Sequence, residues 1–141
     1  MKHTEILKVD SRGRIVIPRS MRKSLGLGEN AQIMAISDSE NKEIKLIPLP
    51  FTNEGSFMKI QIFINDESGS LARIASIFGE LGLSLLYGET VVIKKGEQAE
   101  WTVISPTPEI SLEEFVEILE KKGGALKVNI LEPKTYIYQS D

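Results

Sequence analysis

The stretch from Val9 to Leu27 reads VDSRGRIVIPRSMRKSLGL, and it contains the signals for a turn, a strand and a helix in immediate succession. Ser11-Arg12-Gly13 predicts a turn, because glycine tolerates positive φ and serine favours turn geometry. The β-branched run at residues 14–17 predicts a strand, and residues 5–9 predict another before the turn. The chain therefore opens with a predicted hairpin.

The hairpin leads directly into a short predicted helix from Pro18 to Leu25. Proline suits the first helical position, where its missing N–H is no loss, and Gly26 suits the left-handed residue just past the helix end. Met21 and Leu25 are four residues apart and share one face, while the basic residues point elsewhere. The helix is therefore amphipathic, with a basic outer side.

Positive charge is concentrated in and beside this stretch, where Asp10 is the only acidic residue. Such a run is either a nucleic-acid contact surface or the solvated side of an exposed hairpin. A dimer would present the cations twice and could neutralise on the order of six to ten phosphates, and arginine can also pair with guanine edges. The candidate DNA-binding residues are Lys8, Arg12, Arg14, Arg19, Arg22 and Lys23.

The pattern Val9-Asp10-x-x-Gly13-Arg14-Ile15-x-Ile17-Pro18-x-x-x-Arg22-x-x-Leu25-Gly26-Leu27 resembles the AbrB/MazE/SpoVT family of swapped-hairpin DNA-binding domains. The resemblance implies an obligate dimer, a β-barrel in which the hairpins of two chains interleave. It also implies that basic residues of the turn and helix bind double-stranded DNA. Arg14 and Arg22 match basic positions of the family, and Lys23 keeps the charge of the next one.

The composition separates the chain into two halves of opposite charge. Of its 141 residues, the first 50 hold nine basic and six acidic residues, whereas the remaining 91 hold eight and fourteen. The basic half is the one expected to meet phosphate. The chain has no cysteine, which excludes disulfides and thiol chemistry. It has neither an apolar run of about 20 residues nor an apolar signal core, so we expect a cytoplasmic protein without membrane contact.

A second hairpin follows the helix. Residues 32–37 and 43–47 predict two strands joined by a polar loop, residues 38–42. Two hairpins and one short helix offer little core, and intertwining with a second copy would supply the missing burial. Prolines and a glycine then interrupt the pattern, so we place a DNA-binding domain at 1–50 and a linker at 51–57.

The second half has the order βαββαβ. Residues 58–64 alternate between apolar and polar, residues 71–81 repeat at helical spacing, and two further strands are predicted within residues 83–93 and 99–105. Ser111 and Glu114 form a capping box for a second helix that stops at Gly123-Gly124, and a last strand follows at 126–130. This order predicts a four-stranded antiparallel sheet with two helices on one face, and the whole chain is of the α+β class.

The helix start Asn65-Asp66-x-x-Gly69-Ser70-Leu71 and the later Leu81-Gly82-Leu83-Ser84 resemble an ACT domain, a ferredoxin-like module that senses small molecules. The resemblance places this domain at 58–133, before a tail at 134–141. ACT domains usually pair side by side and hold amino acids at that pairing. Amino-acid-binding members often carry Asn or Asp where Ser84 stands here.

The loop before the first helix of this half has two readings. The N–H groups at a helix N-terminus favour a carboxylate, and Asn65 or Asp66 could meet an ammonium group. In the alternative, Ser68 or Ser70 only caps its own helix and Gly69 relaxes the turn. The candidate ligand-binding residues are Asn65, Asp66, Gly69, Ser70, Leu71 and Ser84.

Together these patterns predict a transcription regulator that binds DNA as a homodimer or tetramer and senses a small molecule, with an amino acid as the candidate effector. The alternatives are a MazE-type antitoxin and an ACT-type regulatory subunit of a biosynthetic enzyme. We expect no catalytic residues, metal site or cofactor, because the chain has no cysteine, one histidine near its start and no paired carboxylates in a predicted cleft.

Overall fold

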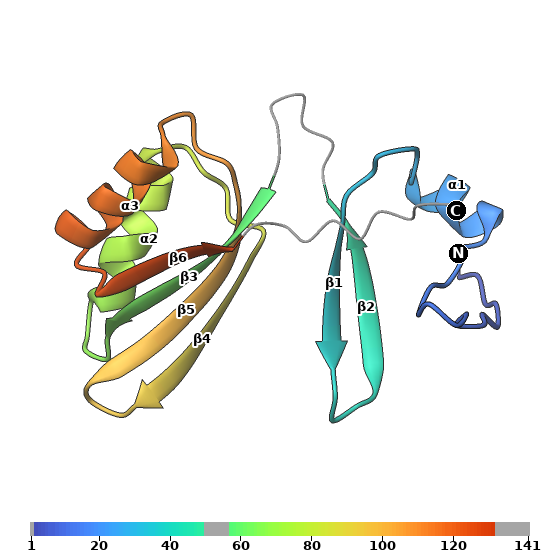
Figure 1. Ribbon diagram of the computed structural model, residues 1–141, viewed down its shortest axis with the longest axis horizontal. Helices are drawn as coiled ribbons and strands as arrows, with labels where there is room; N and C mark the ends of the chain where they lie inside the picture. The colour runs from blue at the N-terminus through green and yellow to red at the C-terminus, as the bar shows by residue number, and fades with distance from the viewer. Residues whose placement is uncertain (1, 50–56, 132–141) are drawn as a thin grey trace. The chain divides into compact units, whose positions relative to one another are not determined.

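A computed structural model describes residues 2–49 and 57–131, and the chain divides into two compact units, residues 1–53 and 54–141 (Figure 1). The predicted tail and the predicted linker lie outside the described residues, except Phe57, which is not linker but the first residue of a strand. The first unit combines one described helix with two strands, and the second combines two helices with four strands, as the α+β prediction requires. None of the described helices has the length and apolar character needed to cross a membrane.

The helix of the first unit, α1 (Arg19–Leu25), ends at the residue expected from the sequence but begins one residue later than predicted, because Pro18 has an extended backbone and is not the first helical residue. Pro18 precedes it as the N-cap and accepts a hydrogen bond from the Arg22 N–H (3.0 Å). Gly26 is left-handed at φ 68°, and the next residue donates its N–H to the Arg22 carbonyl (2.8 Å). This arrangement is a Schellman motif, which ends the helix sharply and returns Leu27 toward its apolar face.

The second hairpin of this unit pairs β1 (Ile33–Asp38) with β2 (Glu43–Pro48) in antiparallel register, with Asp38 opposite Glu43. Asp38 fixes the connecting loop, because its carboxylate accepts hydrogen bonds from the N–H groups of Glu40 and Asn41 (both 3.1 Å). The predicted hairpin is confirmed, and each end of its two strands lies within one residue of the predicted position.

The predicted strands at 5–9 and 14–17 are wrong for the single chain. The two segments flank a closed turn, yet neither is assigned to a sheet among the described residues. Residues 5–9 are all exposed, and so are Arg14, Ile15 and Val16. The physical reason is that a strand needs a paired neighbour and a covered face, and one chain supplies neither here.

The second unit is a four-stranded antiparallel sheet. Its strands are β3 (Phe57–Asn65), β4 (Tyr87–Lys94), β5 (Gln98–Pro106) and β6 (Lys127–Leu131), and they lie in the order β4-β5-β3-β6. The sequence order βαββαβ is therefore confirmed, with β3 and β5 in the centre. Buried and less buried residues alternate along both central strands, which gives the sheet one covered face and one open face.

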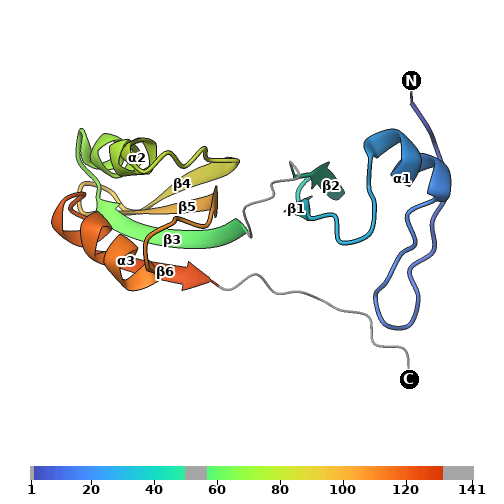
Figure 2. The same cartoon turned by 90° about the horizontal axis from the view of Figure 1, so that it is seen from above.

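Two helices, α2 (Ser70–Glu80) and α3 (Leu112–Lys121), lie on the same side of this sheet (Figures 1 and 2). Phe78 of α2 and Phe115 of α3 are almost fully buried and meet edge to face, with ring centroids 5.5 Å apart. Trp101 of β5 makes a similar contact with Phe78 at 5.8 Å. The serine half of the predicted capping box is confirmed, because the Ser111 hydroxyl accepts the Glu114 N–H at 3.1 Å. This unit therefore has a complete hydrophobic core of its own.

Candidate nucleic-acid interface

The turn at residues 10–14 is built around the carboxylate of Asp10. One of its oxygens, Oδ1, accepts the N–H groups of Arg12 and Arg14 (both 2.9 Å), and Oδ2 accepts the Nε–H of Arg14 at 2.6 Å. The backbone closes the same turn, because the Asp10 N–H donates to the Arg14 carbonyl at 2.9 Å. Gly13 adopts φ 78°, which a residue with a side chain would tolerate poorly.

These contacts lower the pKa of Asp10 below its ordinary value of 3.8, with the hydrogen bond from the Arg14 backbone as the largest cause. A lowered pKa means that folding favours the ionised carboxylate. The stabilisation of the turn is therefore complete above pH 3.8 and is lost as the pH falls through the lower folded value. Asp10 is thus fully charged at neutral pH and holds the turn closed.

The predicted DNA-binding side chains all lie on exposed positions of this unit. Arg12 and Arg14 belong to the turn, and Lys8 lies just before it. The other three lie on α1, where positions 19, 22 and 23 share one face because they are three or four residues apart. The structure therefore collects the six cations on the turn and on one face of one helix: Lys8, Arg12, Arg14, Arg19, Arg22 and Lys23.

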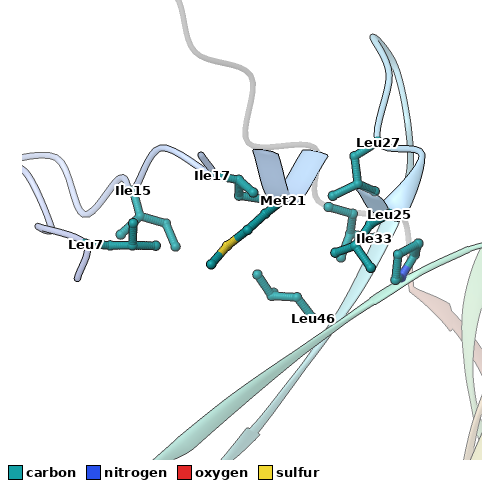
Figure 3. A pocket seen from close by; sticks show the side chains of 9 residues that line it. Leu7, Ile15, Ile17, Met21, Leu25, Leu27, Ile33 and Leu46 are labelled. Atoms are coloured by element: carbon teal, nitrogen blue, oxygen red, sulfur yellow. The ribbon is translucent and has the colours of Figure 1, made fainter. Parts of the chain in front are cut away.

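The other face of α1 contributes to an apolar hollow of about 130 Å³. Met21 lies at its centre, and side chains from the turn arms, α1 and the second hairpin point toward it (Figure 3). None of residues 2–49 is buried in the single chain, and Leu25 and Leu46 are 55% and 42% exposed. The hollow is lined only by apolar residues and proline: Leu7, Ile15, Ile17, Met21, Leu25, Leu27, Ile33, Leu46 and Pro48.

The open apolar hollow and the absence of buried residues at 2–49 both indicate that the apolar side of this unit needs a covering partner. Apolar surface left in water costs roughly 25 cal/mol per Å², and nine such side chains converging on one space would bury that surface if a second layer closed over them. Residues 2–49 of unit 1 therefore form a helix, a hairpin and a closed turn, but they enclose no buried core.

The second candidate site is the loop between β3 and α2. Gly69 is the N-cap of α2 at φ 88°, so the predicted relaxation of the turn by glycine is confirmed and a serine N-cap is wrong. Ser70 is buried and its N–H donates to the Glu67 carbonyl at 3.3 Å, whereas Leu71 is 37% exposed. Arg73 reaches back to this loop, with Nη2 3.7 Å from Glu67 Oε1.

Two of the predicted ligand residues have other surroundings in the structure. The Asp66 carboxylate accepts the Gly96 N–H at 2.7 Å, so it fastens the β4–β5 turn to the loop. Ser84 follows the C-terminal end of α2, whereas Gly69 precedes its start, and an eleven-residue helix is about 16 Å long. One chain therefore does not bring Ser84 together with residues 65–71.

Sequence reasoning missed the roles of Asp10 and Asp66. The spacing Asp10-x-x-Gly13 is a signal for an aspartate that caps its own turn, because Asx side chains bond to backbone N–H groups a few residues ahead. The contact between Asp66 and Gly96 has no such signal, since the two residues are thirty positions apart.

An exposed cationic turn and helix, on a hairpin unit with an uncovered apolar side, are the features of an AbrB/MazE-like domain. Residues 6–52 match the family described as Antidote-toxin recognition MazE, bacterial antitoxin. The match covers a third of the chain and supports the AbrB/MazE-like domain at its N-terminus. No curated protein matches the chain. The match does not extend to the second unit, where the ACT-like assignment stays a prediction.

Proposed function

We propose that the chain is a cytoplasmic, non-enzymatic transcription regulator that binds double-stranded DNA as a homodimer. The observation that carries this proposal is the division of unit 1 into a cationic outer side and an apolar hollow without a core. Closure of the hollow by a second copy would complete the fold and duplicate the six cations. The family match at residues 6–52 supports the same reading.

The pairing of two chains also gives the missing strands a role. Residues 5–9 and 14–17 are largely exposed and belong to no sheet of the described chain, and they flank the turn that carries Arg12 and Arg14. Pairing of these segments across the two copies would fix the turn at a defined place on the dimer. Two symmetric turns would then meet two half-sites of a duplex, as is usual for dimeric DNA-binding proteins.

The finer part of the proposal is that unit 2 senses a small molecule, with an amino acid as candidate effector. The βαββαβ topology and the glycine-started α2 support it, together with the exposed Leu71 beside Gly69. Since Ser84 lies at the other end of α2, a site that uses both ends needs residues from two chains. The coupling to DNA binding would amount to about 1–3 kcal/mol and would act in both directions.

An antitoxin is the second candidate function, because the matched family carries that description. Unit 2 favours the regulator instead. Its core includes the fully buried Ile60, Phe115 and Leu119, and such a domain differs from the disordered toxin-wrapping tail that the resemblance to MazE proteins leads one to expect.

The direct test selects double-stranded fragments from a random pool with the full chain, and then repeats the binding with each of the twenty amino acids added. The regulator proposal expects an enriched palindromic sequence whose affinity shifts at least about fivefold with one amino acid. Enrichment of a sequence without any shift in affinity would support DNA binding by unit 1 and contradict amino-acid sensing by unit 2. If no sequence is enriched and a toxin co-purifies with the chain in a native pull-down, the regulator proposal is wrong and the antitoxin function is supported.

A further inference from the structure

The open face of the unit 2 sheet carries charge of opposite sign on its two halves. Cross-strand neighbours in a sheet share a face, so the register of the four strands defines which residues point away from the helices. Three rows cross all four strands in the order β4, β5, β3, β6: Val91, Glu100, Phe63 and Lys127; Glu89, Thr102, Gln61 and Asn129; Tyr87, Ile104, Lys59 and Leu131. A further row on the same face crosses three strands and contains Lys94, Gln98 and Asn65.

The middle of this face is an ordered polar network. Asn129 Nδ2 donates to Gln61 Oε1 at 3.0 Å, and Gln61 Nε2 donates to Glu100 Oε1 at 2.5 Å. Thr102 Oγ1 lies 3.4 Å from the same carboxylate oxygen. The side chains of the network are half-buried and are joined by these hydrogen bonds across three neighbouring strands.

Charge separates along the same direction. The β4–β5 half carries Glu89 and Glu100, together with Lys94 at the end of β4, and so has a net charge of −1. The β3–β6 half carries Lys59 and Lys127 and has a net charge of +2. All of these side chains are exposed except Glu100, which is half-buried. The apolar residues on the face include Leu131 and Val91, which are 40% and 52% exposed on its two outer strands.

We infer that this open face packs against the open face of a second copy, with a two-fold axis parallel to the strands. Two sheets that pack face to face stand about 10 Å apart with their strands nearly aligned. A two-fold axis along the strands places the β4–β5 half of one copy, which has a net negative charge, over the β3–β6 half of the other, which has a net positive charge. An axis across the strands would place like charges together, which the charge pattern disfavours.

This interface is separate from the proposed closure of unit 1. Each chain then has two self-complementary surfaces, one per unit, and two isologous surfaces per chain give either a doubly joined dimer or a tetramer. The open face therefore explains how the chain could assemble beyond the unit 1 pair, and it does so whether or not the protein binds DNA.

The experiment uses the full chain with Met21→Asp, which places a charge in the unit 1 hollow and leaves unit 2 as the remaining site of association. Sedimentation equilibrium should still find a dimer in this background, weakened by salt because its pairs are exposed. A monomer at concentrations on the order of 100 µM, the weakest range expected of a specific interface, would overturn the inference. If Met21→Asp changes no association at all, the unit 1 proposal fails, but the charge variants still test the open face.

Two charge variants in this background make the test specific. Lys59→Glu/Lys127→Glu gives both halves of the face a net negative charge, and Glu89→Lys/Glu100→Gln removes the acidic half. Each should raise the dimer dissociation constant roughly ten- to a hundredfold, and mixing the two should restore dimers that contain one chain of each kind. The matched control Lys121→Glu/Lys122→Glu makes the same charge change on and just after α3, on the helix side, and should leave the dimer unchanged.

The outcomes separate this face from other surfaces. A dimer that survives both charge variants would assign the association elsewhere, such as the outer edge of β4, and would overturn the inference. Loss of the dimer in the α3 control as well would also overturn it, because net charge alone would then explain the effect. Far-UV circular dichroism and a thermal melt of each variant confirm that unit 2 stays folded.

Discussion

At the scale of single residues, Asp10 shows how one carboxylate can support a cationic surface. It lies among the arginines that are proposed to bind phosphate, where a negative charge should repel DNA. The structure gives it three donors, two backbone N–H groups and the Arg14 side chain, which together close the turn. Asp10 therefore has two opposed effects on DNA affinity: its charge should lower the affinity, and its closure of the turn should raise it.

We predict that Asp10→Ala weakens DNA binding, although it removes an anion from the binding surface. Without the carboxylate the turn loses three hydrogen bonds and Arg14 loses its position, which should lower the affinity about tenfold, as expected for about 1–2 kcal/mol of ordering. Fluorescence anisotropy with a fixed duplex measures this. Glu5→Gln, which removes an exposed anion from the same unit, is the control and should leave binding unchanged or stronger. Tighter binding by Asp10→Ala would contradict the assigned role.

A second residue-scale prediction concerns Arg22, which lies on the exposed face of α1 and is not part of the hollow. Arg22→Ala should weaken DNA binding for all sequences and reduce the slope of log affinity against log salt by about one for each phosphate that the variant no longer neutralises. The dimer should persist. Lys45→Ala on β2 removes an exposed cation from the other hairpin and serves as the matched control. An unchanged slope in Arg22→Ala would remove this residue from the interface.

At the scale of elements, α1 has two faces with separate tasks. Its apolar face contributes Met21 and Leu25 to the hollow, and its other face carries cations. The Schellman motif and Pro18 fix where the helix starts and stops, so neither face can rotate into the place of the other. Substitutions on the two faces should therefore have different consequences.

We predict that Met21→Asp separates the unit 1 dimer and abolishes DNA binding, although no cation is removed. Losing a buried methionine costs roughly 1.5–3 kcal/mol per chain, and an unpaired charge in an apolar interior costs more. Analytical ultracentrifugation and anisotropy measure the two losses together. Ser20→Asp adds the same charge to the exposed neighbouring position and should keep the dimer. DNA binding that survives in a Met21→Asp monomer would contradict the account.

In unit 2, the close approach of the two helices depends on Gly123. A Cβ at this position would lie 2.6 Å from the Leu119 carbonyl and 2.7 and 2.8 Å from Ile74 and Ile77. Gly123→Ala should therefore destabilise the unit by about 1–3 kcal/mol in urea denaturation, because the core cannot yield without strain. Gly79→Ala on α2, where nothing lies within 4 Å, should instead stabilise it by about 0.5–1 kcal/mol. Equal effects of the two substitutions would contradict this packing.

The elements also show what the sequence could predict. Helix α1, its glycine stop, the second hairpin, the N-cap at Ser111 and the βαββαβ order all follow from local patterns, and the structure confirms them. The strands at 5–9 and 14–17 could not be confirmed in one chain, because their pairing depends on a neighbour. The Gln61 network and the Gly123 contact depend on which distant strands and helices meet, which no local pattern encodes.

At the scale of the whole molecule, the two units differ in how complete they are. Unit 2 buries a continuous core between its sheet and its helices, whereas none of residues 2–49 is buried. A unit without a buried core is stable only when a partner covers its apolar side. The proposed DNA binding of unit 1 therefore depends on its association with a second copy. The basic half of the sequence lies in this dependent unit and the acidic half in the self-sufficient one.

The proposed function requires that the cations of two paired unit 1 copies bind DNA through its phosphates. The most direct measurement is the affinity of the full chain for a duplex between about 50 mM and 200 mM salt, with the mass of the complex determined in parallel. We expect a dimer on the duplex and an affinity that falls by about 10³–10⁵ across this range, as is typical of roughly six to ten neutralised phosphates. Binding that does not respond to salt, or a monomer on the duplex, would contradict the proposed function.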